Sequence, residues 1–385
     1  MGELIAPNEN TLPALHRLPE ILAGSPFNLR NFPNNEQSPI IASRNDYEAC
    51  HSFLARFESK STLRAYRKEI ERLLLWCVVE KLSFGQINKE AVDSYIHFLK
   101  NPTPRRLWCY ASDKARSTPR NSPAWKPFVT GLTDKALKQH LNIISSLFKY
   151  LSDACYLRKN PFALCVREKY ASDTTHFTTL ERIPTKQEWQ LILQTLKSWP
   201  NEKEKVRLKF IIAILFYTGM RLSELASLQW SSFHHTQAGW SIFIIGKGGK
   251  PREVVVEDLL IDIIDYRQSL GLSLLPEKNE VTPVICNLEG DKGISDRQIF
   301  NLVKGLALKA ASGEGVDALV KTRLSRFSPH WIRHLCPTLM ARAGVDTRTI
   351  QRHLGHSSSR TTEVYVHLLN DDKRDAVRQL TLGDY

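Results

Sequence analysis

The sequence predicts a mainly α-helical protein with a small antiparallel β-sheet, arranged as two domains. Apolar residues recur at spacings of three and four along much of the chain, which is typical of amphipathic helices. Residues that favour strands are concentrated at 240–245 and 251–256, on either side of a glycine-rich turn. A length of 385 residues is ample for two domains.

The N-terminal half is expected to form a helical domain at residues 46–165. It follows an arm at residues 1–45 that is rich in Pro, Asn and Ser and has little periodicity, so we expect the arm to be poorly ordered. One helix begins near Ser61, which can cap it. A second helix is predicted over 89–100, and a third begins near Thr133.

The C-terminal half is expected to begin after a polar linker at residues 166–184. A capping box at Thr185 opens its first helix. A buried helix at 210–217 ends at Gly219, and the hairpin follows it. Helices are also predicted from Ser295 through Ala310 and from Pro329 onward. Pro337 falls inside the last of these, so we expect a kink there and an altered position for His334. This domain would span 185–370 and end in a tail at 371–385.

The charge balance favours a polyanionic partner such as DNA or RNA. Lys and Arg number 53 against 40 Asp and Glu, a formal net charge of +13. The seven cysteines are scattered and show no C-x-x-C pair, as in a protein of a reducing compartment. The start lacks a signal-peptide pattern, and the longest apolar run is too short to span a bilayer. We therefore expect a cytoplasmic protein with no membrane partner.

Residues 101–131 form an insert between the second and third predicted helices. It contains five prolines, two tryptophans and six Lys or Arg against one Asp. A long segment without a period is usually functional or disordered. One interpretation is a plain surface insert, and the other is a basic loop in which Trp108 and Trp125 contact DNA. The candidate DNA-binding residues of this loop are Arg105, Arg106, Arg116 and Arg120.

Six residues of the C-terminal domain form a set suited to a phosphodiester. They are Arg221, Lys247, His330, Arg333, His356 and Tyr365. Arginine presents a planar fork that binds two phosphate oxygens, so Arg221 and Arg333 could hold the phosphate and stabilise the transition state. His330 and Arg333 are three apart and share one helix face. Glu224, three residues after Arg221, is the expected supporting partner of that arginine.

The remaining candidates supply the chemistry. Tyr365 is the candidate nucleophile, and because a phenol has a pKa near 10 it needs a base and a cationic environment. His330 is a suitable acid or base. Lys247 lies at the hairpin tip and is the candidate acid for the departing 5′ oxygen, with Lys250 as the alternative.

Metal and nucleotide sites are disfavoured by the same residues. The pairs His330/His334 and His353/His356 have helical metal-ligand spacing, but Arg333 lies beside the first pair and would repel a cation. The turn at 246–250 is not a phosphate-binding loop, since Pro251 stands where Ser or Thr is needed. We expect no cofactor and no metal.

In these residues the chain resembles the tyrosine site-specific recombinases, the phage-integrase family that includes the Xer-type resolvases. Its six candidates follow the family pattern R…K…HxxR…[H/W]…Y in order. The flanking residues also match TGxRxSEL, GKGxKxR, SPHxxRH and LGHSSxxTTxxYxH. The resemblance is strong over about 185–370 and weaker over about 50–165.

The resemblance implies a site-specific recombinase or integrase whose two domains clamp double-stranded DNA. Tyr365 would form a 3′-phosphotyrosyl bond, His356 would support the phosphate, and four protomers would join two DNA sites through a Holliday junction without metal or ATP. The family favours Lys247 over Lys250. The tail, with a helical pattern at 375–380, would either dock on a neighbouring subunit or close its own domain. A type IB topoisomerase and a non-catalytic DNA-binding relative are the alternatives.

Overall fold

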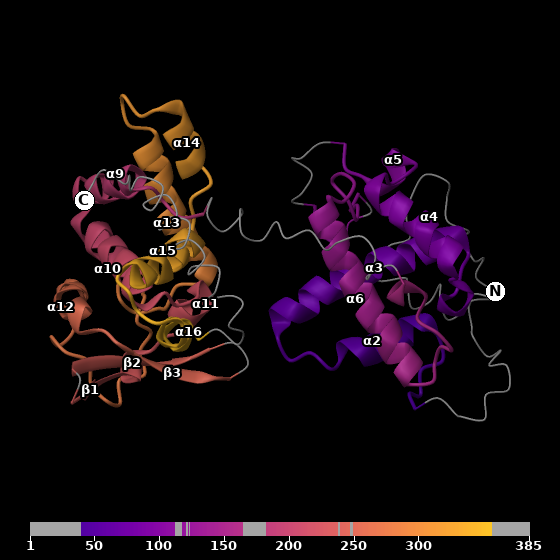
Figure 1. The fold of residues 1–385 in the computed structure, drawn as a ribbon, viewed down its shortest axis with the longest axis horizontal. Helices are drawn as coiled ribbons and strands as arrows, with labels where there is room; N and C mark the ends of the chain where they lie inside the picture. Colours follow the sequence, from indigo (N-terminus) through magenta and orange to yellow (C-terminus); the bar gives the residue numbers. More distant parts are fainter. Residues whose placement is uncertain are drawn as a thin grey trace, which may run out of the picture. The chain divides into compact units, whose positions relative to one another are not determined.

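The chain divides into two compact units, Met1–Ser172 and Asp173–Tyr385 (Figure 1). In this computed structural model the described residues are 40–111, 118–120, 122, 124–164, 182–237, 239–246 and 249–355. The boundaries expected at 165/166 and 370/371 lie outside them. No helix within these ranges is long and apolar enough to cross a membrane.

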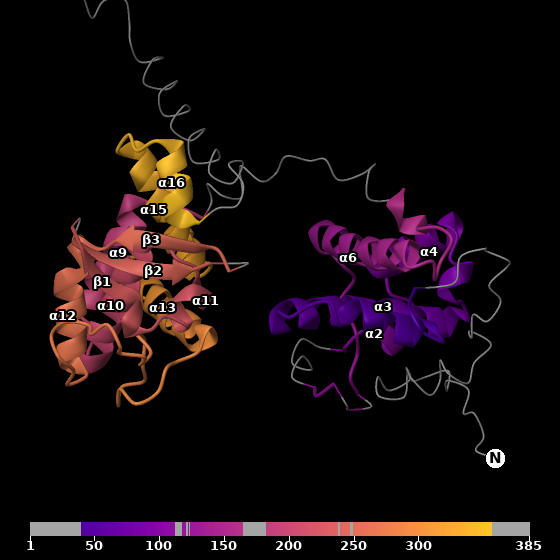
Figure 2. The same ribbon diagram turned by 90° about the horizontal axis from the view of Figure 1, so that it is seen from below.

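The N-terminal unit is helical. Its helices are α2 (Asp46–Leu54), α3 (Lys60–Glu80), α4 (Lys89–Lys100), α5 (Arg105–Trp108) and α6 (Asp134–Asp153), joined by the short 3-10 helices η2 (Phe84–Gln86) and η4 (Pro161–Ala163). α3 and α6 pack against each other and both contact α2, as Figure 2 shows from below.

Two of the three predicted helix starts in this unit are confirmed. α4 begins and ends where the sequence predicts, and Thr133 caps α6 by accepting a hydrogen bond from the backbone N–H of Ala136. The cap of α3 is Ser59, which accepts from the N–H of Thr62, so the assignment to Ser61 is wrong. Ser61 lies in the first turn of α3. It was taken for the cap because the apolar pattern that indicates the helix begins after the helix itself has started.

The insert contributes to the core of this unit. Trp108 and Phe128 are each 1% exposed, and their rings meet edge to face. The guanidinium of Arg72 on α3 donates twice to the carbonyl of Pro127, at 3.2 and 2.9 Å, and lies over the Phe128 ring. The interpretation in which Trp108 contacts DNA is therefore wrong, because this side chain is buried. Trp125 is half-buried, and Arg120 stacks on it.

The C-terminal unit wraps helices around α10 and adds a three-stranded sheet. Its helices are α9 (Lys186–Lys197), α10 (Glu202–Thr218), α11 (Leu222–Ala226), α12 (Leu260–Ser269), α13 (Asp296–Ala311), α14 (Ala318–Leu324), α15 (Pro329–Arg342) and α16 (Thr347–Leu354), with η5 (Trp230–Ser232) and η6 (Glu257–Leu259) between them. α10 contacts α9, α12, α13 and α15, and its Ile211 and Ile214 are fully buried.

The sheet is antiparallel with the order β1 (Phe233–Thr236), β2 (Gly239–Ile245) and β3 (Pro251–Val255). Its register pairs Ile244 with Arg252. The predicted hairpin is confirmed. Strand β1 was not predicted because its sequence, Phe-His-His-Thr, lacks an apolar alternation.

The predicted helix starts at Thr185 and Ser295 are confirmed, each with a capping box. The helix expected at 210–217 begins earlier, at Glu202, where Asn201 caps it. The sequence analysis missed this start because the first residues of the helix are polar. α15 continues through Pro337 to Arg342, so the proline does not end the helix.

Gly219 ends α10 at the point where α15 and α16 approach it. The glycine has φ 54° and its N–H bonds the carbonyl of Leu215 at 3.0 Å. A Cβ at this position would lie 2.5 Å from Cδ2 of the buried Leu354 and 3.2 Å from Sγ of Cys336. Only glycine therefore fits both the backbone conformation and the close packing that leads into Arg221.

We predict that Gly219→Ala destabilises the protein more than Gly271→Ala. Both glycines have a positive φ, but a Cβ on Gly271 meets nothing within 4 Å. Gly271→Ala should carry only the backbone strain, while Gly219→Ala adds an overpacking cost of about 1–3 kcal/mol. Thermal unfolding measures the difference, and equal losses of melting temperature would contradict it.

Candidate functional site

Arg221 occupies the turn between α10 and α11. It is the cap residue of α11, and its own backbone N–H donates to Oε2 of Glu224 at 2.9 Å. Its guanidinium Nη1 donates to Oε1 of the same carboxylate at 2.7 Å. The side chain of Arg221 is 31% exposed, so part of its guanidinium remains open to a ligand while Glu224 fixes its direction.

Glu224 is a buried carboxylate shared by two arginines. Besides Arg221, it accepts a 2.7 Å hydrogen bond from Nη2 of Arg252 on β3. Burial by itself raises the pKa of Glu224, but the hydrogen bonds from Arg252 and Arg221 outweigh it and hold the pKa below its usual value. The carboxylate is therefore charged at neutral pH. The expected contact between Glu224 and Arg221 is present, and the second arginine was not foreseen.

Arg333 lies on α15, buried beside the same turn. Its Nη1 donates to the carbonyl of Gly219, and its Nη2 donates to the carbonyl of Leu354 at 3.0 Å. Leu354 is the last residue of α16, whose final carbonyls carry the negative end of the helix dipole. Arg333 thus ties the end of α10 to the end of α16 and lies near Arg221 in the fold.

His330 lies one turn before Arg333 on α15. Its ring centroid is 4.3 Å from that of His334, and the two rings are nearly perpendicular. The pKa of His330 is lowered, first by the partial removal of water around its ring and then by the charges of Arg182, Arg333 and Arg221. Its imidazole is therefore neutral at neutral pH, the form that accepts a proton.

The other three predicted catalytic residues, Lys247, His356 and Tyr365, lie outside the described residues. On either side of Lys247, the backbone N–H of Gly246 donates to the carbonyl of Lys250 at 2.8 Å. Lys250 is exposed. Of the predicted set, the structure therefore brings together Arg221, Glu224, His330 and Arg333.

Arg252 is a member of this cluster that the sequence prediction missed. It is buried, it bonds Glu224, and its Nε donates to the carbonyl of His353 at 3.0 Å. A signal was present in the sequence, since strand alternation puts Arg252 on the same inward face as Val254. Arg182, whose charge acts on His330, was also missed, because it lies in the expected linker.

The cluster concentrates positive charge around a single described carboxylate. Arg221, Arg252 and Arg333 converge on Glu224 or on backbone carbonyls of α10 and α16, and Arg182 adds a fourth charge nearby. Such an arrangement is suited to an anion that accepts forked hydrogen bonds. In the part of the chain that the structure describes, no three His, Cys, Asp or Glu side chains are grouped to hold a metal ion.

The predicted DNA-binding arginines of the insert have different environments. Arg105 and Arg106 are exposed on α5. Arg120 pairs with Glu71 on α3 and stacks on Trp125. Arg116 is not among the described residues. The positive charge of Arg120 is thus partly compensated within the protein.

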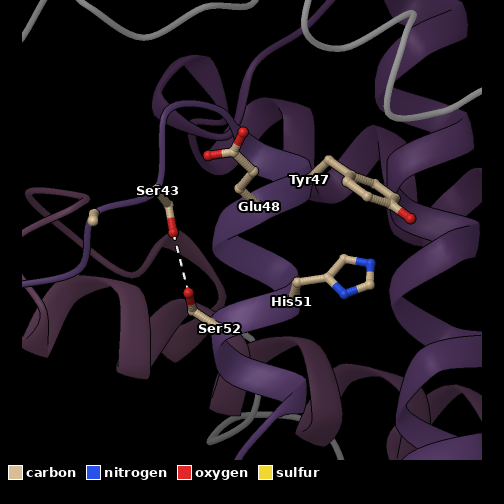
Figure 3. A pocket seen from close by; sticks show the side chains of 6 residues that line it. Ser43, Tyr47, Glu48, His51 and Ser52 are labelled. Carbon is tan, nitrogen blue, oxygen red and sulfur yellow. Dashed lines mark hydrogen bonds between the residues drawn. The ribbon is translucent and has the colours of Figure 1, made fainter.

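A hollow near the start of α2 is separate from the arginine cluster. Tyr47, Glu48, His51 and Ser52 of α2 line it together with Ala42 and Ser43, as Figure 3 shows. Ser43 and Ser52 are hydrogen-bonded at 3.2 Å, and the rings of Tyr47 and His51 are 4.6 Å apart. The hollow belongs to the N-terminal unit and contains none of the predicted catalytic residues.

Comparison with known proteins identifies relatives over most of the chain. The phage integrase family matches residues 182–371. A tyrosine recombinase of Thermosipho africanus is 24% identical over 326 residues, which cover 84% of this chain and 95% of the relative. The tyrosine recombinase XerD of Vibrio cholerae is 25% identical over 315 residues, covering 81% of this chain and 87% of XerD.

Solved structures share the fold. The XerH site-specific recombinase bound to a palindromic difH substrate aligns with a TM-score of 0.57 at 19% identity, covering 86% of this chain and 83% of XerH. The Tn1549 transposon integrase in complex with circular intermediate DNA aligns with a TM-score of 0.54 at 15% identity, covering 86% of this chain and 95% of the integrase chain.

We predict that Arg182→Ala raises the pKa of His330 toward its ordinary value. Arg182 is exposed, so its removal takes away one nearby positive charge without disturbing the core. NMR titration of the histidine ring protons measures the shift. His353 is the internal control: its pKa is lowered by burial and by the charges of Arg252 and Arg333, which the substitution leaves in place, so it should not change. An unchanged His330 pKa would contradict the electrostatic description of the site.

Proposed function

We propose that this chain, a tyrosine recombinase of the phage integrase family whose relatives break and rejoin DNA, exchanges strands between two double-stranded DNA sites through a covalent bond to Tyr365. The observation that carries the proposal is the convergence of Arg221, Glu224, His330 and Arg333 from α11 and α15. Arg221 and Arg333, the first and last of these residues, are 112 positions apart in the sequence, and the fold brings them together.

The two family arginines would hold the scissile phosphate. Attack on a phosphodiester concentrates negative charge on its non-bridging oxygens, and a preorganised donor of this kind contributes about 3–4 kcal/mol to catalysis. Arg221 is oriented by Glu224, and Arg333 by the carbonyls of Gly219 and Leu354. Because these contacts exist before DNA binds, the guanidinium groups need little reorganisation during the reaction.

The proton transfers would be divided between two groups. His330, whose lowered pKa keeps it neutral, would accept the proton of the Tyr365 hydroxyl. Lys247 would give a proton to the departing 5′ oxygen, with Lys250 as the alternative, and His356 would support the phosphate. The bond energy is retained in the 3′-phosphotyrosyl link, so the released 5′ hydroxyl of the partner strand can attack it without ATP or metal.

The assembly would be a homotetramer that joins two DNA sites. The lambda integrase has been solved as a tetramer bound to a Holliday junction, with the same fold at a TM-score of 0.50. In this chain the N-terminal unit and the C-terminal unit would each contact the duplex, with the linker between them at 166–184. The formal charge of +13 favours such a partner.

We predict that Tyr365→Phe abolishes the covalent adduct with DNA and leaves DNA affinity nearly unchanged. The hydroxyl is the nucleophile, whereas affinity comes largely from many phosphate contacts. The substrate is a nicked duplex taken from the DNA that flanks the gene, and the adduct is detected on a denaturing gel. Tyr217→Phe, a tyrosine of the same unit, is the control. A persistent adduct in the Tyr365 variant would contradict the assignment.

We predict that the insert contributes phosphate contacts. Replacing Arg105, Arg106, Arg116 and Arg120 with Ala should weaken DNA binding about equally for all sequences and flatten the plot of log affinity against log salt. Each lost phosphate contact lowers the slope by about 0.9, so four contacts would lower it by about 3.6. The pairing of Arg120 with Glu71 suggests a smaller contribution from that residue.

The control for the insert removes the same charge elsewhere. Lys197, Lys203, Lys278 and Lys292 are exposed in the C-terminal unit. Replacing these four lysines with Ala changes the net charge equally and should alter the slope less. If the slope of the insert variant equals that of the wild type, these four arginines make no phosphate contacts and the proposal for the insert is wrong.

A further inference from the structure

Arg252 lies at the centre of the arginine cluster. It is the last residue of the GKGxKxR pattern, but the sequence analysis assigned it no role. It lies on β3 and is 9% exposed. Its Nη2 donates to Oε2 of Glu224 at 2.7 Å, and its Nε donates to the carbonyl of His353 at 3.0 Å. One guanidinium therefore connects the strand to α11 and to the last turn of α16.

Two glycines allow the backbone to approach this guanidinium. A Cβ on Gly246 would lie 3.3 Å from Nη1 of Arg252, and a Cβ on Gly355 would lie 3.1 Å from the same atom. Gly355 also has φ 63°, which favours glycine. In the sequence these glycines come directly before Lys247 and His356. Arg252 thus packs against segments that lead into two of the predicted catalytic residues.

We propose that Arg252 is a positioning residue that fixes Arg221, through Glu224, and the end of α16, through the His353 carbonyl. The inference rests on the proposed function, because Arg221 is there assigned to the scissile phosphate. Glu224 accepts from Arg252 and Arg221 at the same time, so the place of its carboxylate decides the direction in which Arg221 points.

The planar guanidinium is required for this role. It donates from Nε and Nη2 in directions fixed by one rigid plane, and its two acceptors come from different elements. A lysine at this position would keep the charge but present one compact ammonium on a flexible stem. It could satisfy the carboxylate or the carbonyl, but it could not hold both in the observed geometry.

The test is single-turnover cleavage by the full-length Arg252→Lys variant within a preformed complex with the nicked site DNA. We expect the cleavage rate to fall by about 10- to 100-fold, as misplacement of catalytic groups by about 1 Å typically causes. DNA affinity should stay close to that of the wild type, since Arg252 is buried and its guanidinium already donates to Glu224 and to the carbonyl of His353.

A matched control is Arg267→Lys. Arg267 is a buried arginine of the same unit that pairs with Glu280 at 2.9 Å and donates to the carbonyl of Ser273 at 2.7 Å. It therefore reports the general effect of exchanging a buried, ion-paired arginine for lysine. We expect this control to lower the melting temperature and to leave the cleavage rate in the complex unchanged. Equal losses of cleavage in both variants would overturn the positioning role.

A double-mutant comparison separates positioning from an independent contribution. If Arg252 acts through Arg221, then Arg252→Lys should lower cleavage little further in an Arg221→Lys background. If the two substitutions lower the cleavage rate independently, so that their effects multiply, the proposal is overturned.

Should Arg252→Lys fail to fold, Glu224→Gln tests the same connection, because it keeps the side-chain shape and removes the charge that Arg252 and Arg221 share. Wild-type cleavage by Glu224→Gln would likewise overturn the proposal.

The two levels of the hypothesis fail differently. A wild-type chain that forms no covalent adduct with the site DNA would overturn the proposed function itself. An active wild type together with an equally active Arg252→Lys variant would overturn only the role of Arg252.

Discussion

The site depends on one buried carboxylate, that of Glu224, held between Arg221 and Arg252. A buried ion pair adds little net stability, but removing one partner leaves an uncompensated charge and typically costs about 3–5 kcal/mol. The arrangement therefore enforces its own geometry, since Glu224 is tolerated inside the unit only while both arginines reach it. Arg221 is in this way directed before any substrate arrives.

Backbone carbonyls accept hydrogen bonds from Arg252 and Arg333 and hold these two side chains in place. The end of α16 offers the carbonyls of His353 and Leu354, which accept from Arg252 and Arg333. Helix ends leave such carbonyls without partners within the helix, and cations are favoured there. Gly219 supplies a further carbonyl and permits α10, α15 and α16 to meet. The carbonyls that accept from Arg252 and Arg333 thus lie at the ends of α10 and α16.

Sequence reasoning predicted the elements that carry strong local signals. The capping box at Thr185, the helix start at Ser295 and the helix predicted over 89–100 are all present in the structure. The first turn of α10 was missed because its residues, Glu202–Lys205, are charged. The cap of α3 was misplaced by two residues because the apolar pattern begins after the helix has started. Local patterns identify an element more reliably than they identify its end.

Only part of the site was predicted from the sequence, because its other members are brought in by tertiary contacts that local patterns do not indicate. Motif spacing singled out Arg221, Glu224, His330 and Arg333, which the fold brings together. Nothing local indicated that Arg252 would bond both Glu224 and a carbonyl 101 residues away. The burial of Trp108 was missed for the same reason. Its ring packs against Phe98 on α4 and against Phe128, and prolines separate it from both in the sequence.

The most direct test is a crystal or cryo-EM structure of the Tyr365→Phe protein bound to its DNA site. The account predicts that the scissile phosphate lies within hydrogen-bond distance of the guanidinium groups of Arg221 and Arg333, with Glu224 still between Arg221 and Arg252. A phosphate bound elsewhere, or an Arg221 turned away from it while Glu224 keeps its partners, would contradict the account.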